Sequence, residues 1–161
     1  MFADLALLIA VCAPDVHPAT AMAIVAHESR LNPWAVGING ARASSQPTTR
    51  EQALTLAKTM VAKGYSVDVG YAQINTATLK KLGLSIEQGF EPCRNLGAMQ
   101  IVLISNYALA AEQLGEGQPA LQAALSAYNT GNMRAGVRNG YVRAVYRHAP
   151  IKRSGQQTKH E

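Results

Sequence analysis

Residues 18–30 read Pro-Ala-Thr-Ala-Met-Ala-Ile-Val-Ala-His-Glu-Ser-Arg. Proline is favoured in the first turn of a helix, and apolar side chains fill nearly every later position up to Ala26. A helix that is apolar on almost all sides belongs inside a fold. We therefore expect a central, buried helix from Pro18 to about Arg30, ended by Asn32-Pro33.

Glu28 lies near the end of this expected helix. Counting back at helical spacing gives Val25, Ile24 and Ala21, so Glu28 continues an apolar face. Burial raises the pKa of a carboxyl group, and the negative end of the helix dipole acts in the same direction. A carboxyl group that stays protonated near neutral pH can act as a general acid. The alternative is a solvent-facing Glu28 paired with Arg30.

The remaining pattern predicts a mainly helical chain with one small β element. Residues 65–71 alternate with strand period, and residues 35–47, rich in Gly, Asn, Ser and Pro, predict a loop. Thr48-x-x-Glu51 predicts a capping box. Further helices are expected at about 2–12, 48–63, 76–82, 85–88, 94–114, 119–128 and 141–148. We expect one domain over residues 1–150 and a flexible basic tail over 151–161.

Composition limits the classes of function. Of the 161 residues, 48% are apolar, yet no apolar run reaches the roughly 18–20 residues needed to cross a membrane, so stable membrane insertion is not expected. The net charge of +5 suits a polyanionic partner such as nucleic acid, an anionic membrane or the bacterial cell wall.

The first residues resemble a signal peptide with a lipid-attachment cysteine, but Asp4 stands where positive charge is expected. A buried first helix is the better interpretation, with any export signal absent from this chain.

Neither nucleic-acid binding nor metal binding has a supporting motif. Six basic residues cluster late in the chain: Arg134, Arg138, Arg143, Arg147, Lys152 and Arg153. No helix-turn-helix, zinc-finger or stacking motif accompanies them, so we do not expect a nucleic-acid partner. The four histidines include no pair at the spacing of helical metal ligands. We expect no metal and no cofactor.

The two cysteines, Cys12 and Cys93, are far apart and form no C-x-x-C motif. Two buried free thiols and a disulfide are both compatible with this spacing. A disulfide would close a long loop and would indicate an oxidising compartment.

Four short motifs occur in order over about residues 12–147. They are Glu28-Ser29-x-x-Asn32-Pro33, Gly70-Tyr71-Ala72-Gln73-Ile74-Asn75, Ala124-Leu125-Ser126-Ala127-Tyr128-Asn129-Thr130-Gly131 and Asn139-Gly140-Tyr141-Val142. Together they resemble the motifs of the soluble lytic transglycosylases, relatives of goose-type lysozyme. The chain departs from that pattern at Tyr71-Ala72, where the family more often has Leu-Met, a change that alters shape near the expected sugar site.

Two further segments are similar to the branch attached to conjugation and type IV secretion machines. They are Cys12-Ala13-Pro14 and Glu91-Pro92-Cys93-x-Asn95-Leu96. This resemblance implies a Cys12–Cys93 disulfide, a periplasmic location and components of such a machine as partners. It also implies a mainly α, lysozyme-like fold, in which a helical bundle surrounds a substrate cleft with a small β-hairpin on one wall. Oligomeric state has no signal, and a monomer is the default.

The activity implied by the resemblance is cleavage of the β-1,4 bond between N-acetylmuramic acid and N-acetylglucosamine in peptidoglycan, without consumption of water. Glu28 would act first as acid and then as base, giving a 1,6-anhydromuramyl product. The implied substrate contacts are Ser29, Tyr71, Gln73, Asn75, Tyr128, Asn129 and Tyr141, although Asn75 could simply cap the next helix.

Two alternatives to transglycosylation remain open. One is ordinary hydrolysis, which usually needs a second carboxylate about 5–9.5 Å from the first. Asp68, in the β element, is the best candidate for that group. The other alternative is an inactive scaffold that only binds glycan.

Overall fold

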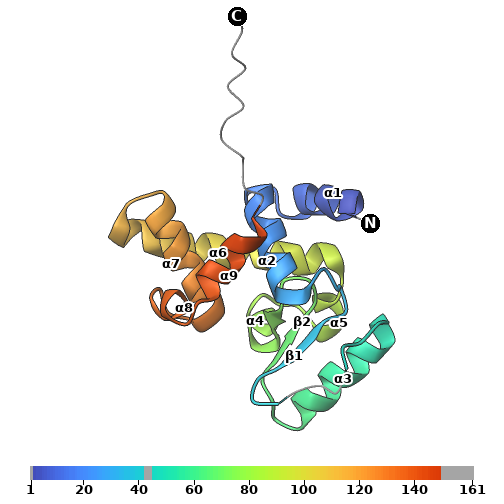
Figure 1. Cartoon of the computed structure of the whole chain (residues 1–161). Coiled ribbons are helices and arrows are strands. Elements are labelled where there is room, and N and C mark those ends of the chain that lie inside the picture. The colour runs from blue at the N-terminus through green and yellow to red at the C-terminus, as the bar shows by residue number, and fades with distance from the viewer. Residues whose placement is uncertain (1, 42–44, 150–161) are drawn as a thin grey trace, which may run out of the picture.

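The structure, a computed structural model, describes residues 2–41 and 45–149. Helices dominate these residues and a small sheet accompanies them, which is consistent with the expected lysozyme-like fold (Figure 1). The elements are α1 (Phe2–Cys12), α2 (Pro18–Ser29), β1 (Val36–Ile38), α3 (Arg50–Ala62), β2 (Val67–Val69), β3 (Ile74–Asn75), α4 (Thr76–Lys81), α5 (Ile86–Gly89), α6 (Pro92–Leu114), α7 (Gln118–Thr130), α8 (Ala135–Arg138) and α9 (Tyr141–His148).

Helix α2 is the central helix that its sequence predicts. Its buried residues include Ala21, Ala23, Ile24 and Val25, and α1 and α9 both pack against it. In Figure 1, α7, α8 and α9 lie to one side of α2, which we call the helical side. The sheet with α3, α4 and α5 lies to the other, which we call the sheet side. The end of α2, where Glu28 lies, therefore stands between the helical side and the sheet side.

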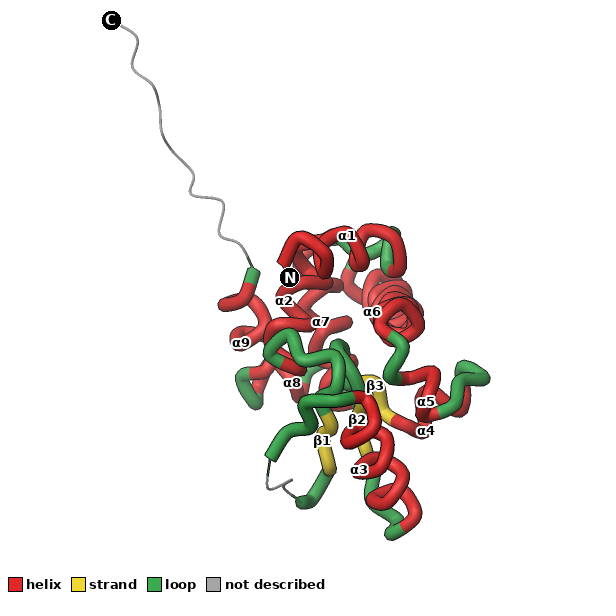
Figure 2. The backbone as a smooth tube through the Cα atoms, turned by 90° about the vertical axis from the view of Figure 1, so that its right-hand side faces the viewer, coloured by secondary structure: helices red, strands yellow, loops and turns green. Residues whose placement is uncertain are grey.

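Three short antiparallel strands form the sheet, in the order β1-β2-β3. Figure 2 shows them side by side, next to α3 and below α2 and α7 in that view. The β element predicted at 65–71 is confirmed as β2, and β2 with β3 forms the expected hairpin. The loop prediction for 35–47 is wrong at β1, which pairs Val36 with Val69. The residues around β1 show no alternation like that of residues 65–71 around β2, so β1 has no local signal, and it exists because β2 supplies its partner.

Several helix boundaries differ from the prediction for local reasons. The cap of α3 is Thr49, whose side chain accepts from the Gln52 amide, so the Thr48-x-x-Glu51 box is wrong by one residue. Helix α7 runs on to Thr130, two residues past its expected end, and the four-residue α8 was not predicted. Helix α1 buries one face only, because Leu7 and Val11 are 66% and 67% exposed. The expectation of a buried first helix is therefore wrong.

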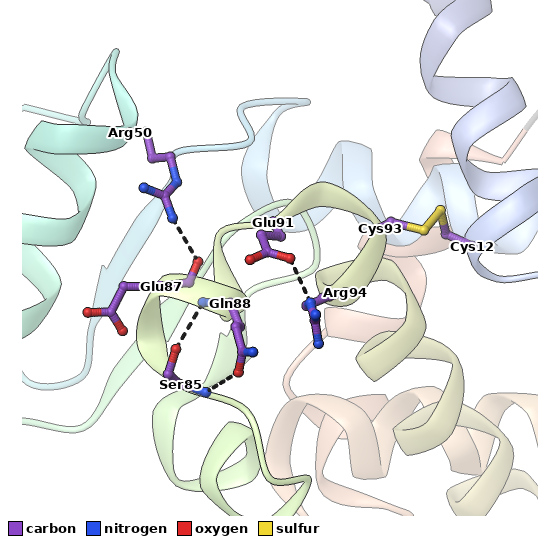
Figure 3. A network of polar contacts seen from close by, with 8 residues as sticks. All are labelled: Cys12, Arg50, Ser85, Glu87, Gln88, Glu91, Cys93 and Arg94. Atoms are coloured by element: carbon purple, nitrogen blue, oxygen red, sulfur yellow. Dashed lines mark hydrogen bonds and ion pairs between the residues drawn. A yellow bond between two sulfur atoms is a disulfide. The ribbon is translucent and has the colours of Figure 1, made fainter.

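A disulfide joins Cys12 at the end of α1 to Cys93 in the first turn of α6, which confirms the pairing implied by the resemblance. Figure 3 shows this corner together with α5, whose capping box is formed by Ser85 and Gln88. Next to it, Arg94 donates to Glu91 across 2.6 Å. These contacts fix the start of α6, the longest helix of the described residues, against α1 and α5.

No helix of the described residues is long and apolar enough to cross a membrane. The basic tail predicted at 151–161 lies outside the described residues.

Candidate active site

Glu28 and Tyr141 meet where the end of α2 faces the start of α9. The Tyr141 hydroxyl donates a hydrogen bond of 2.5 Å to Glu28 Oε1. Tyr141 is itself buried, and Gly140, just before it, has a φ of 88°, a left-handed conformation that glycine adopts without strain. The turn at Gly140 thus begins α9 at the point where its first side chain reaches the carboxyl group of Glu28.

The pKa of Glu28 is raised from its ordinary value of 4.5 to about 7. Burial is the main cause, because it disfavours the charged form. The Tyr141 hydrogen bond stabilises the carboxylate and lowers the pKa, while the nearby charge of Asp68 raises it. The direction is the one expected from the apolar helix. No ion pair joins Glu28 to Arg30 in the described part of the chain, so the alternative based on that pair is not supported.

Glu28 faces a pocket of about 260 Å³ between the helical side and the sheet side, which we call the Asp68 pocket. Asp68 projects into it from β2, since its neighbours Val67 and Val69 turn inward to the core. The lining residues are Glu28, Asn39, Asp68, Gln73, Ile74, Asn75, Thr78, Val102, Tyr128 and Asn129. The pocket therefore holds two carboxyl groups and several amides and hydroxyls, a lining suited to a sugar.

Two asparagine amides hold Asp68 in place. Asn75 Nδ2 donates to one carboxylate oxygen across 2.8 Å, and Asn39 Nδ2 donates to the other across 3.0 Å. Burial raises the pKa of Asp68, and these two hydrogen bonds lower it. Asn75 also caps α4, because its Oδ1 accepts from the Ala77 amide. The capping role considered from sequence is thus present, and the Asn75 amide group is directed to Asp68.

Gln73 lines the Asp68 pocket and its side chain is hydrogen-bonded to the neighbouring backbone. Its Nε2 donates to the carbonyl oxygens of Ala35 and Gly70, which occupies both amide hydrogens and leaves Oε1 as an acceptor. Gln73 has a φ of 49°, and holding a residue other than glycine in the left-handed region costs about 1 kcal/mol or more. The two hydrogen bonds offset that cost and fix the turn between β2 and β3.

Tyr128 closes the pocket from α7. Its hydroxyl donates to the Ala72 carbonyl across 2.7 Å. The Ala72 amide in turn donates to Oδ1 of Asn95, which is 1% exposed and has its Nδ2 hydrogens on two other backbone carbonyls. Asn95 therefore positions the segment that Tyr128 contacts. Asn129 is exposed at the rim and accepts from Asn139.

A second pocket, of about 280 Å³, shares Glu28 and Gln73 with the first and is lined by His27, Glu28, Ser29, Arg30, Ala35, Val36, Gly37, Gln46 and Gln73. We call it the Arg30 pocket. Ser29 is buried and its hydroxyl donates to the Val25 carbonyl, so it is not a solvent-facing hydroxyl. Tyr71 is half-buried and lines neither pocket.

Sequence reasoning did not assign Asn39, Thr78, Val102 or the positioning role of Asn95. Asn39 follows β1, in a segment that looked like loop, and no local signal shows that it faces Asp68. Thr78 and Val102 reach the pocket only because α4 and α6 converge on it. Among the described residues, no group of three or more His, Cys, Asp or Glu side chains is placed to hold a metal ion.

Comparison of the sequence with known proteins identifies a family and several relatives. Residues 7–148 match the family described as Transglycosylase SLT domain. The chain is 38% identical over 146 residues to the type IV secretion system protein virB1 of Brucella abortus biovar 1 (strain 9-941), covering 87% of this chain and 61% of that protein. It is 39% identical over 134 residues to protein virB1 of Rhizobium radiobacter, covering 83% of this chain and 56% of that protein.

The chain thus spans about three fifths of the length of these relatives. No solved structure shows a significant match to it. The family match covers most of the chain, including all four sequence motifs and the site around Glu28. The chain belongs to the SLT transglycosylase domain family.

Proposed function

We propose that this chain is a lytic transglycosylase domain that cleaves the β-1,4 bond between N-acetylmuramic acid and N-acetylglucosamine in peptidoglycan. The observation that carries the proposal is Glu28, a carboxyl group with a pKa of about 7, held by Tyr141 at the wall of a polar cleft. A group with a pKa near the working pH can both give and accept a proton during one reaction.

In the proposed reaction, Glu28 protonates the leaving glycosidic oxygen as the bond to the anomeric carbon breaks. The muramyl acetamido group assists at that carbon. Glu28, now a carboxylate, takes the proton from the 6-hydroxyl of the same sugar, and that oxygen closes the 1,6-anhydro ring. One proton leaves Glu28 and one returns, so the enzyme ends in its starting state and no water is consumed.

The surrounding residues have distinct proposed roles. Tyr141 orients Glu28 and tunes its pKa, and Ser29 holds the last turn of α2 that carries Glu28. Tyr128 and Asn129 form the helical wall of the Asp68 pocket. Gln73 offers its free Oε1 to the sugar, whereas Asn75 acts through Asp68. A substrate contact by Tyr71 is supported only by its place in the second motif.

We further propose that the enzyme opens the cell wall locally, in the periplasm, for a type IV secretion machine. Two relatives named virB1 support this context, one of them described as a type IV secretion system protein. The net charge of +5 suits an anionic cell-wall substrate. The proposed partners are glycan strands and components of that machine, with the domain itself acting as a monomer.

The alternative considered from the sequence is hydrolysis of the same bond, which the family match does not favour. Its second carboxylate would be Asp68, which lines the same pocket as Glu28 and raises the pKa of Glu28. In that reaction Asp68 would activate water or bind the anomeric carbon, and the product would carry a reducing-end muramic acid.

Digestion of purified peptidoglycan with chromatography of the products tests the proposal. The wild type should release 1,6-anhydromuramyl products, and Glu28→Gln should reduce their rate at least about 100-fold, the usual contribution of a general acid. The control is Glu112→Gln, an exposed carboxyl group on α6. Reducing-end products would favour the hydrolase, and undiminished lysis by Glu28→Gln would remove Glu28 from the mechanism.

A further inference from the structure

The Arg30 pocket and the Asp68 pocket adjoin each other and form the two halves of the proposed substrate cleft. Glu28 and Gln73 line both, so the two cavities meet at the proposed catalytic carboxyl group. A glycan strand whose cleaved bond lies at Glu28 would extend to both sides. The residues that line the Arg30 pocket would therefore influence which substrate binds. This inference rests on the proposed function.

The two halves carry charges of opposite sign. The Asp68 pocket contains the carboxyl group of Asp68 from β2, whereas the Arg30 pocket contains an arginine and a histidine. Burial lowers the pKa of His27, and His148 beside it acts in the same direction, so His27 is mainly neutral near neutral pH. Among the described residues lining this half, Arg30 carries the permanent positive charge.

The Arg30 side chain makes no polar contact with another residue in the described part of the fold. It is exposed and has neither an ion pair nor a side-chain hydrogen bond with another described residue. A guanidinium group has five donors in a planar fork that matches a carboxylate. That of Arg30 lies at the pocket wall, and no described residue uses its hydrogen-bonding capacity.

The backbone conformation at Arg30 is unusual for an arginine. Arg30 ends α2 with a φ of 52° and a ψ of 38°, the left-handed conformation in which glycine is the favoured residue. Leu31 follows with a φ of 66°. An arginine is strained there, and no side-chain hydrogen bond or ion pair with a described residue offsets the strain. Residues held in this way are concentrated at functional sites.

We propose that Arg30 binds a carboxylate carried by the muramyl unit of the substrate. Two sources share this chemistry: the lactyl carboxylate of a glycan strand without peptide, and a carboxylate of an attached stem peptide. Either one would be attracted to the Arg30 pocket and repelled from Asp68. The pair of charges thus selects a muramyl-containing strand over an uncharged glycan and fixes the direction in which the strand lies.

Binding measurements in a Glu28→Gln background test this proposal without cleavage of the ligand. Isothermal titration calorimetry compares chitotetraose, which is uncharged, with three tetrasaccharides of alternating N-acetylglucosamine and N-acetylmuramic acid. One carries free lactyl carboxylates, one carries stem peptides, and one carries stem peptides whose carboxyl groups are all amidated. The protein variants are Arg30→Gln and, as a matched control, Arg143→Gln, an exposed arginine of α9 that lines neither pocket.

Arg30→Gln should weaken binding of a carboxylate-bearing tetrasaccharide roughly fivefold to tenfold, as expected for an exposed charge-assisted contact. It should leave the affinity for chitotetraose and for the amidated ligand unchanged, and Arg143→Gln should change none of them. Weakening with free lactyl groups identifies the lactyl carboxylate, and weakening with stem peptides alone identifies the peptide. Equal affinities for all ligands in both variants, or equal weakening of chitotetraose, would overturn the proposal.

The variant Arg30→Gly separates loss of the carboxylate contact from loss of folding. Glycine suits the left-handed conformation, so this variant should keep or raise the thermal midpoint while losing the carboxylate preference. A loss of binding accompanied by unfolding would count against the proposal. A failure of the proposed function would be seen in a different measurement. The wild-type protein would then release no anhydro product from peptidoglycan, whichever ligand Arg30 binds.

Discussion

The Tyr141 hydroxyl donates a 2.5 Å hydrogen bond to Glu28 Oε1, although the two residues are 113 positions apart in the chain. The bond connects the last turn of α2 with the first residue of α9. His27 packs edge-on against the Tyr141 ring, with centroids 5.1 Å apart. The orientation of the proposed acid thus depends on how two distant helices pack.

Tyr141→Phe removes this hydrogen bond and keeps the ring. The bond lowers the pKa of Glu28, so its loss should raise that pKa above about 7. The limb of the pH–rate profile that depends on protonated Glu28 should move to higher pH. We also expect kcat to fall about tenfold, because Glu28 loses its fixed orientation. A profile that does not move would show that the bond has no influence on Glu28 in solution.

Asp68→Asn should move the same limb in the opposite direction. The charge of Asp68 raises the pKa of Glu28, and a neutral amide should let that pKa fall below about 7. Anhydro products should persist at a lower rate, measured by chromatography of the digest with Glu112→Gln as control. Complete loss of activity at every pH would instead support the hydrolase, in which Asp68 is a second catalytic carboxylate.

Stability should depend on pH through Glu28. The folded protein holds its proton up to about pH 7, whereas the unfolded chain releases it near 4.5. The contribution of Glu28 to the free energy of unfolding should therefore be largest below pH 4.5. It should fall by at most about 3 kcal/mol as the pH rises to 7. Urea unfolding should show that the stability of Glu28→Gln relative to wild type increases over this interval. A constant difference would contradict a raised pKa.

Removal of the Cys12–Cys93 disulfide should lower stability more than activity. The bond closes a loop with a sequence separation of 81 residues, which corresponds to about 4 kcal/mol in the chain-entropy account. A double Cys12→Ser, Cys93→Ser variant should therefore unfold at a lower urea concentration. Any folded fraction should still release anhydro products, because neither cysteine lines the Asp68 pocket. Equal stability of the variant and the wild type would show that the loop is already constrained without the bond.

Much of the fold followed from local pattern. The apolar run of α2, the capping signals of α4 and α5 and the glycine after α6 act within a few residues, so periodicity and caps located them. The strand β1, the short helix α8 and the exposed face of α1 did not follow. Each depends on a partner that is distant in sequence: β2 for β1, α7 and α9 for α8, and α2 and α6 for the buried face of α1.

The sequence by itself placed Glu28 in the last turn of an apolar helix and predicted the direction in which burial would shift its pKa, because both inferences use residues within that helix. It also determined the family, since the four motifs are local strings in a fixed order. Only the tertiary structure decided which groups surround Glu28. Tyr141 tunes it from α9, Asp68 faces it from β2, and Arg30 lines the second pocket beside it without a polar side-chain partner among the described residues. Those relationships arise from packing between segments far apart in the chain, which no local pattern encodes.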